Sequence, residues 1–350
     1  MAGVLRGRAM ALRAPADKLA PRKQFVEVTP LRIRPGLQRA ATLAAALLPL
    51  LAACGQSAAP RAPKHEDPRP ISGFTLRQAG HLPAPAEGLA AAAQDGSVLI
   101  FGGLGPQGSL SAIYMLQGGR LSAAGQLPVA AHDLAAAPLP GGGILVAGGG
   151  QVASFDSIYR YRNGRVSLVG RLPTPRSDVT AVPLAGKVYL FGGYTGASFV
   201  STILALDGRG RATVAGELPL GLRYVGAAAL GGSVYIFGGL AVAGYQDAIY
   251  RFTPGHGVTR VGSLPVAVRA PLVAAGQGGI LIAGGESAPG RDQAGVYWYA
   301  GSGSPRAIGR LPAPIALGAV VYLGHDRFEL IGGEDGQQLA AGIFTLQLRR

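Results

Sequence analysis

The 350-residue sequence has little cysteine, tryptophan or charge. With a single cysteine, Cys54, it cannot form an internal disulfide framework. Charged residues make up only 14% of the chain, and there is one tryptophan. No stretch carries ten or more residues of the 3.6-residue apolar period that an amphipathic helix needs. These absences exclude a disulfide-stapled scaffold and a helical architecture.

Glycine and hydrophobic residues are abundant instead. The chain contains 56 glycines and 26 prolines, and 48% of its residues are hydrophobic. Much glycine and proline without a collagen period can accompany disorder, but that hydrophobic content argues against it. We therefore expect glycine to separate many short buried elements, in a chain long enough to bury a large core.

The positive charge is concentrated at the front of the chain. The formal net charge is +14, yet residues 1–54 hold nine basic residues against two acidic ones, which leaves 23 against 16 for the rest. The remaining basic residues form no tract and are not interleaved with aromatic residues. A nucleic-acid surface requires clustered basic residues, so we predict no nucleic-acid partner. The scattered basic residues are instead interpreted as an ordinary solvated surface.

Residues 40–53 form a 14-residue apolar run, AATLAAALLPLLAA, which Pro49 interrupts. A membrane-spanning helix requires about 20 apolar residues, so this run is too short. Three arginines precede it: Arg32, Arg34 and Arg39. A basic leader, a short apolar run and small residues at its end predict a signal peptide over residues 39–54.

The apolar run ends in Leu51-Ala52-Ala53-Cys54, followed by Gly55. This tetrad resembles the lipobox of bacterial lipoproteins. The resemblance implies cleavage before Cys54, diacylglycerol on its sulfur and an acylated amine, and two or more acyl chains suffice for stable anchoring. The alternative is a chance cysteine after an ordinary signal peptide. We expect a membrane-anchored lipoprotein of the bacterial cell envelope, facing the periplasm or the exterior.

Two segments flank this signal. Residues 1–38 are an N-terminal extension plus the basic leader, longer than such leaders usually are, and we hypothesise a downstream start at Val28. Residues 55–70, GQSAAPRAPKHEDPRP, contain four prolines and no apolar period. Their composition predicts an extended tether with a reach of about 50 Å.

Three sequence marks recur six times over residues 71–350. An apolar run ends in a Gly-Gly pair at 102–103, 148–149, 192–193, 238–239, 284–285 and 332–333. A Gly-x-Leu-Pro motif begins at Gly80, Gly125, Gly170, Gly216, Gly262 and Gly309. An Ile-Tyr-like pair begins at Ile113, Ile158, Ile203, Ile249, Val296 and Ile343. The three motifs recur together at intervals of 44 to 48 residues, which indicates a repeat architecture.

Each repeat divides into four strand-length segments. In residues 179–216 these are Val179–Pro183, Val188–Phe191, Ile203–Leu206 and Thr213–Ala215, separated by glycine-containing turns. The first segment of each unit is rich in small residues, as a strand near a narrow axis would be. The second is continuously apolar, as a strand covered on both faces would be. Four short strands per unit predict an all-β fold, a six-bladed β-propeller of four-stranded antiparallel blades.

The two ends of the repeat region complement each other. Phe74–Gly80 has the pattern of a fourth strand with no blade before it, and the chain ends after a third strand, Ile343–Leu348. We predict that this N-terminal outer strand joins the C-terminal blade, because closure removes open sheet edges.

The Gly-Gly end of the second strand, the loop and the Ile-Tyr strand together resemble the Kelch repeat over residues 71–350. That resemblance implies a propeller that binds or scaffolds a partner, and some bacterial Kelch-type propellers act as sugar epimerases or mutarotases. Kelch repeats usually carry a tryptophan on the fourth strand, whereas Trp298 lies on a third strand. The repeats are therefore divergent, and no Kelch partner is carried over. We expect a monomer.

Several chemistries are excluded. Gly103-x-Gly105-x-x-Gly108 fits the dinucleotide fingerprint, but that motif must open a helix, which Pro106 and the following strand pattern prevent. There is no Gly-x-Ser-x-Gly motif, and the five histidines lack metal-ligand spacing. Cys54 is the only cysteine, which leaves none for the cysteine–tyrosine copper chemistry of Kelch-like oxidases. We predict no cofactor, no metal and no catalytic residue.

Candidate ligand-binding residues lie in the loops after strands two and four, which emerge on one face of a propeller. Four residues after each Leu-Pro proline stand Glu87, His132, Ser177, Arg223, Arg269 and Ala316. Further candidates in these loops are Arg176, Tyr194, Tyr224, Tyr245, Glu286 and Glu334. In a repeat array, loop positions that are equivalent in geometry can carry different side chains, and together they form a ring-shaped binding surface. The alternative is ordinary solvated loop residues, or arginines that tie blades together.

Two function classes stay open. The first is a binding or scaffold protein whose arginine-containing mouth takes an acidic protein or a glycan. The second is an enzyme of the sugar epimerase or mutarotase type, which requires a carboxylate and an arginine or histidine converging on one pocket. Glu87 or Glu334 with Arg223 are the candidates, and convergence of these side chains would favour the enzyme.

Overall fold

The computed structural model describes residues 70–336 and 338–350. Over these residues the chain forms 28 β-strands and no helix, so no described helix could cross a membrane. The predictions for residues 1–38, for the signal peptide and lipidation site at 39–54, and for the tether up to residue 69 lie outside the described residues.

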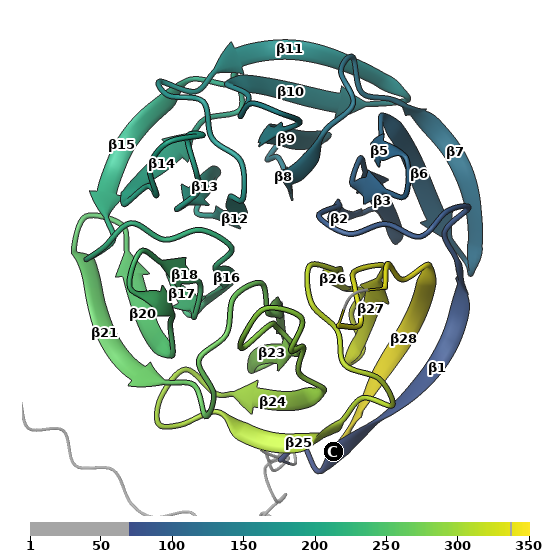
Figure 1. Ribbon diagram of the computed structural model, residues 1–350, viewed down its shortest axis with the longest axis vertical. Helices are drawn as coiled ribbons and strands as arrows, with labels where there is room; N and C mark the ends of the chain where they lie inside the picture. The colour runs from purple at the N-terminus through teal and green to yellow at the C-terminus, as the bar shows by residue number, and fades with distance from the viewer. Residues whose placement is uncertain (1–69, 337) are drawn as a thin grey trace, which may run out of the picture. The chain divides into compact units, whose positions relative to one another are not determined.

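Six four-stranded antiparallel sheets surround a central axis (Figure 1). Blades one and two contain, from the axis outward, β2 (Ala90–Gln94), β3 (Ser97–Phe101), β6 (Ala112–Gln117), β7 (Arg120–Gln126), then β8 (His132–Pro138), β9 (Ile144–Gly150), β10 (Ser157–Arg162), β11 (Arg165–Arg171). Blades three and four contain β12 (Thr180–Leu184), β13 (Lys187–Phe191), β14 (Thr202–Leu206), β15 (Ala212–Glu217), then β16 (Gly226–Leu230), β17 (Ser233–Phe237), β20 (Ala248–Thr253), β21 (Gly257–Ser263). The predicted fold class is confirmed.

Blades five and six complete the circle. They contain β22 (Leu272–Gly276), β23 (Gly279–Ala283), β24 (Gly295–Tyr299), β25 (Arg306–Arg310), then β26 (Ala319–Tyr322), β27 (Arg327–Ile331), β28 (Gly342–Arg349) and β1 (Gly73–His81). Two small hairpins lie in loops, β4 (Leu104–Gly105) with β5 (Gly108–Ser109) and β18 (Leu240–Ala241) with β19 (Gly244–Tyr245).

The sixth blade is assembled from both ends of the described chain. Strand β1 pairs antiparallel with β28, from Gly73 opposite Arg349 to His81 opposite Gly342. In Figure 1 the β1 ribbon lies along the outer edge of the yellow C-terminal blade. As a fourth strand, β1 runs toward the face that carries the loops after strands two and four. The chain therefore enters and leaves the propeller on the opposite face.

The Gly-Gly and Leu-Pro marks meet between neighbouring blades. A Leu-Pro motif leads into each blade, and the carbonyl three residues after its proline accepts a hydrogen bond from the preceding blade. The donor is the N–H of the second glycine of that blade's Gly-Gly pair. Gly285 N, for example, donates to Ile315 O at 2.8 Å. The first glycine leaves no space for a side chain, because a Cβ at Gly284 would lie 2.1 Å from the same oxygen. These two repeated motifs are thus the two halves of one contact between blades.

The Ile-Tyr mark also pairs with a glycine. The first residue of each Ile-Tyr-like pair lies opposite the glycine of a Gly-x-Leu-Pro motif, as Ile113 does Gly125 and Ile343 does Gly80. The register of strands three and four shifts next to this pair. A bulge of this kind bends the outer strand and increases its twist, as a curved blade requires.

The core is divided among the interfaces between blades. The second strands are almost wholly buried, since Phe101, Phe191 and Phe237 are all fully inaccessible to solvent. Phe191 of blade three, for example, packs in one cluster with Ile236 and Phe252 of blade four. A single repeat cannot bury both faces of its second strand, so each blade depends on its neighbours.

Candidate functional site

The mouth is defined here as two loops from each blade, the loop before the inner strand and the loop after the second strand. Backbone bridges join these loops in every blade. The bridged residues are Glu87 and Leu104, His132 and Gly150, Ser177 and Tyr194, Arg223 and Leu240, Arg269 and Glu286, and Ala316 and Glu334. The six positions that follow the Leu-Pro motifs are therefore structurally equivalent, and they adjoin the loops that supply Tyr194, Glu286 and Glu334.

The next residue of each repeat forms a ring around the axis, the axial ring. Its members have φ between +49° and +59° and are Gly88, Asp133, Asp178, Tyr224, Ala270 and Leu317. Asp133 N donates to Gly88 O at 2.7 Å, Asp178 N to Asp133 O at 2.9 Å, and Gly88 N to Leu317 O at 2.8 Å. Left-handed backbone is costly for residues other than glycine. Hydrogen bonds that run from blade to blade hold the ring in this conformation.

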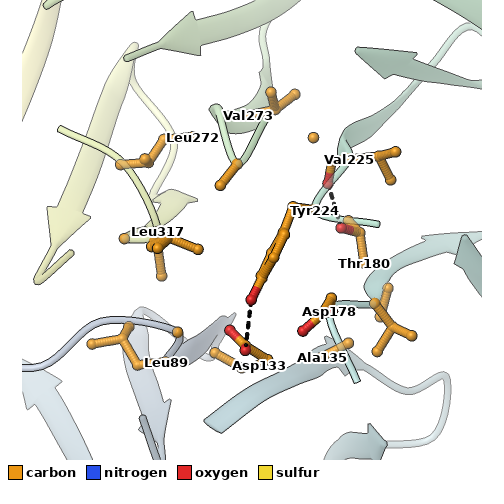
Figure 2. Close-up of a pocket in the computed structure, with 18 of the residues that line it drawn as sticks. Leu89, Asp133, Ala135, Asp178, Thr180, Tyr224, Val225, Leu272, Val273 and Leu317 are labelled. Atoms are coloured by element: carbon orange, nitrogen blue, oxygen red, sulfur yellow. Dashed lines mark hydrogen bonds between the residues drawn. The ribbon is translucent and has the colours of Figure 1, made fainter. Parts of the chain in front are cut away.

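The axial ring gathers a polar cluster on one side. Tyr224 Oη donates to Asp133 Oδ2 at 2.9 Å, and Arg223 Nη2 donates to Tyr224 Oη at 3.1 Å. Arg223 Nε forms an ion pair with Asp178 Oδ2 at 2.6 Å, and Asp178 is only 4% exposed. Figure 2 shows the Tyr224 side chain extending across the axis with its hydroxyl toward Asp133.

Burial shifts the pKa values of Asp133, Tyr224 and His132. Burial, with the adjacent Asp178 carboxylate as the next cause, raises the pKa of Asp133 well above its ordinary value. Burial and the charge of Asp133 also raise the pKa of Tyr224. Burial lowers the pKa of His132, whose Nδ1 lies 2.9 Å from Ser109 Oγ. The buried Asp133 carboxyl therefore holds its proton to higher pH than an ordinary aspartate does.

A second group, the acidic cluster, lies in the mouth where blades five, six and one meet. Glu286 is 3% exposed and forms an ion pair with Arg269 Nε. Its carboxylate also accepts from Tyr245 Oη at 3.1 Å and Gly290 N at 2.9 Å. The other members are Glu87, Asp292 and Glu334. Among the described residues, Arg269 is the one cation that influences these carboxyl groups, and it is paired with Glu286.

The carboxyl groups of Glu87 and Glu334 lie close enough within the acidic cluster to influence each other's pKa. Burial, followed by the charge of Glu87, raises the pKa of Glu334 to about 7. Burial also raises the pKa of Glu87. Two carboxyl groups this close cannot both ionise at low cost, so the pair holds one proton near neutral pH.

Glu286, Asp292 and Glu334 each place one carboxylate oxygen within 4.8 Å of the other two, and these residues could hold a metal ion. Oxygen ligands of this kind suit Ca²⁺ or Mg²⁺. However, Asp292 Oδ2 already accepts from Gly336 N at 2.6 Å, and Glu286 is paired with Arg269. Internal donors thus compete for the same oxygens.

Arg176 differs from the other predicted site residues. It is 2% exposed, and its Nη1 donates to Gly192 O at 3.3 Å and Thr202 O at 3.2 Å. These contacts brace the second and third strands of its own blade. Its guanidinium therefore does not face a ligand at the mouth.

The remaining arginines and Tyr194 do lie together at the mouth. The Arg223 guanidinium carbon is 4.7 Å from the centre of the Tyr194 ring and 4.5 Å from that of Tyr224, and Arg269 is 4.9 Å from the latter. Both arginines are also ion-paired, with Asp178 and Glu286. The mouth therefore contains arginines, as predicted for positions 223 and 269, but each is paired with a carboxylate. Six carboxyl groups face these two guanidinium groups, from Glu87, Asp133, Asp178, Glu286, Asp292 and Glu334.

Three of these six acids were missed in the sequence. Asp133 and Asp178 stand one residue beyond the positions singled out in each repeat. Aspartate tolerates left-handed backbone better than most residues, so a comparison of all six repeats at that position could have found them. Asp292 lies in the loop between β23 and β24, away from the three repeated motifs, and no sequence signal marks it.

Comparison with solved structures shows the fold. A structure titled "Structure of YjhT" matches with a TM-score of 0.66 at 16% sequence identity, covering 77% of this chain and 98% of that one. The chain is a six-bladed β-propeller. No model of a protein family matches the sequence, and no curated protein matches it either. The Kelch resemblance thus stays a prediction from the sequence.

Proposed function

We propose that this propeller is a glycan-binding protein of the bacterial cell envelope and that its mouth is the binding surface. The observation that carries the proposal is the set of structurally equivalent mouth positions that present carboxylates, guanidinium groups and tyrosines together. Sugar hydroxyls can donate to carboxylates and accept from arginines, and aromatic faces cover their apolar sides. A few convergent polar groups on a concave surface are typical of small-molecule sites.

The charge of the mouth favours a glycan over an acidic protein. An acidic protein would require unpaired arginines, whereas Arg223 and Arg269 are each paired with a buried carboxylate. The unpaired charge in the mouth is negative and would repel such a partner. A ligand with hydroxyl groups avoids this repulsion.

A second candidate function is proton transfer on a sugar, as in an epimerase or mutarotase. The Glu87–Glu334 pair favours it, because a general acid or base works best with a pKa near the operating pH. An arginine also lies near this carboxyl pair, as an enzyme of this type requires, but it is Arg269 rather than the predicted Arg223. The two candidates share one site and differ only in whether bound sugar is released unchanged.

A saccharide panel tests both candidates in one experiment. Saturation-transfer NMR with neutral, N-acetylated and acidic sugars is expected to detect binding to the wild type. The double variant Glu87→Gln/Glu334→Gln is expected to bind at least about tenfold more weakly, a loss of about 1.4 kcal/mol. Asp95→Asn in the β2–β3 turn, on the opposite face, is the matched control and should bind as the wild type does.

Equal saturation transfer to the wild type and to the double variant would overturn the glycan site. Anomer or epimer exchange in the same spectra separates the two functions. Exchange that rises with pH to a plateau above about pH 7, and that is lost in the double variant, would establish the enzyme, since deprotonated Glu334 is then the base. Binding without exchange would establish a binding protein.

We also propose that lipid on Cys54 attaches the protein to a membrane. Its support is the Leu-Ala-Ala-Cys sequence at the end of the apolar run. Cys54→Ala is expected to shift the protein from the membrane fraction to the soluble fraction of cells, whereas Ser57→Ala should not. A Cys54→Ala protein that stays with the membrane contradicts the anchor.

A further inference from the structure

The axis of the propeller contains a cavity of about 190 Å³ on the mouth side. Residues at the start of all six inner strands line it. One wall is polar and carries Asp133, Asp178 and Tyr224, and the other is apolar and includes Val273 and Leu317 (Figure 2). A polar wall opposite an apolar wall suits a small ligand with one polar end.

The charges along the polar wall do not balance. Asp178 is neutralised by Arg223, whereas Asp133 contacts Asp178 and the Tyr224 hydroxyl. The other charged neighbours do not compensate Asp133. Arg269 is paired with Glu286, and the His132 imidazole, with Nε2 3.8 Å from Asp133 Oδ2, is held neutral by burial. Among the described residues, Arg223 thus serves two carboxyl groups, and ionising Asp133 as well as Asp178 would bury a net negative charge, which is unfavourable.

We propose that this axial cavity binds a primary alkylammonium ion, with the ammonium group against Asp133 and the alkyl chain against Val273 and Leu317. An ammonium group has three N–H donors and no acceptor, which matches a wall of carboxylate oxygens. At a pH below the pKa of Asp133, the cation takes the place of the proton on Asp133, so each ion that binds releases one proton to solvent.

This site is separate from the proposed glycan site. Glu87, Glu286, Asp292 and Glu334 do not line the axial cavity, and Asp133 is not part of the acidic cluster. The inference therefore goes beyond the proposed function. It can hold even if no sugar binds to the mouth.

Titration of the wild type with n-butylammonium chloride and with 1-butanol tests the proposal. The two probes have similar size and shape and differ in charge. We expect the ammonium ion to bind at least about tenfold more tightly, and a pH-stat in unbuffered salt solution to record about one proton released per ion bound. Affinity should rise with pH up to the pKa of Asp133 and then level off, because protons compete with the ligand for this carboxyl group.

Asp133→Asn keeps the size of the side chain and removes its charge. It is expected to weaken butylammonium binding at least about tenfold and to abolish proton release, while Asp95→Asn leaves both unchanged. Leu317→Asn, which suits the left-handed backbone there, should weaken butylammonium more than methylammonium. Equal affinity for the ammonium ion and the alcohol, or binding without proton release, would overturn the proposal without recourse to any variant.

Discussion

Deletion of residues 71–80 is expected to abolish cooperative unfolding of the propeller. These residues contain most of β1, the outer strand of the sixth blade, which pairs along its length with β28. Without them, β28 becomes an open edge and the sixth blade loses one of its four strands. Thermal unfolding followed by circular dichroism should lose its single sharp transition.

The reason for so large an effect is that the deleted segment contributes to the core as well as to the sheet edge. Ile71 is 3% exposed and belongs to the cluster between blades five and six, against which Phe74 and Leu76 also pack. Arg306 of blade five donates to the Ile71 carbonyl. Full burial of one large apolar side chain contributes about 1.5–3 kcal/mol, and Phe74 and Leu76 are partly buried, so their joint loss is a large fraction of the total stability of many domains.

Deletion of residues 55–64, also ten residues long, is the matched control for this experiment. These residues precede the described part of the chain, and their removal takes no strand from any blade. The control should unfold at the wild-type temperature. An unchanged melting temperature after deletion of 71–80 would contradict closure by β1.

Gly284→Ala is expected to destabilise the protein by more than about 3 kcal/mol, well above the effect of most single substitutions. Gly284 has φ +67°, and an added Cβ would lie 2.1 Å from the Ile315 carbonyl oxygen. The backbone cannot move away easily, because Gly284 N donates to Gly295 O and Gly285 N donates to that same Ile315 O. Guanidinium unfolding followed by tyrosine and tryptophan fluorescence measures the change.

Gly278→Ala in the same blade separates backbone strain from the clash. Gly278 has φ +80°, but nothing lies within 4 Å of a Cβ built there. Gly278→Ala should lower the free energy of unfolding by only about 1–2 kcal/mol, because a residue with a Cβ is disfavoured by that amount in left-handed backbone. If both variants lose the same stability, the close approach between blades does not matter and the structural account of the Gly-Gly motif is wrong.

The same contact explains why the fold could be predicted from the sequence. The first glycine of every Gly-Gly pair would place a Cβ within 2.1–2.6 Å of a carbonyl oxygen of the next blade's entry loop. Only glycine fits at each of these six positions, because any other residue would bring its Cβ against that oxygen. Spacing between these glycines therefore reveals the number of blades and their length.

The residues of the mouth are not restricted by such a close approach, so the sequence predicts only some of them correctly. Loop positions at the mouth were identified, and the structure places Glu87, Arg223, Arg269, Tyr194, Glu286 and Glu334 there. Arg176 was assigned to the same surface because it precedes Ser177, but its guanidinium is buried within its own blade. A sequence position beside a loop does not specify the direction of a long, flexible side chain.

The sequence alone determined the six-fold repeat, its strands and the closing role of β1, because these depend on local turns, apolar patterning and glycines that admit no side chain. Only the tertiary structure decided which charges meet. Asp133 and Tyr224 are 91 residues apart, yet they share a hydrogen bond because the ring brings every blade to one axis. Glu87 and Glu334 are likewise joined only when the first and last blades close. The raised pKa values at the mouth and the axis arise from that closure, which no stretch of sequence contains.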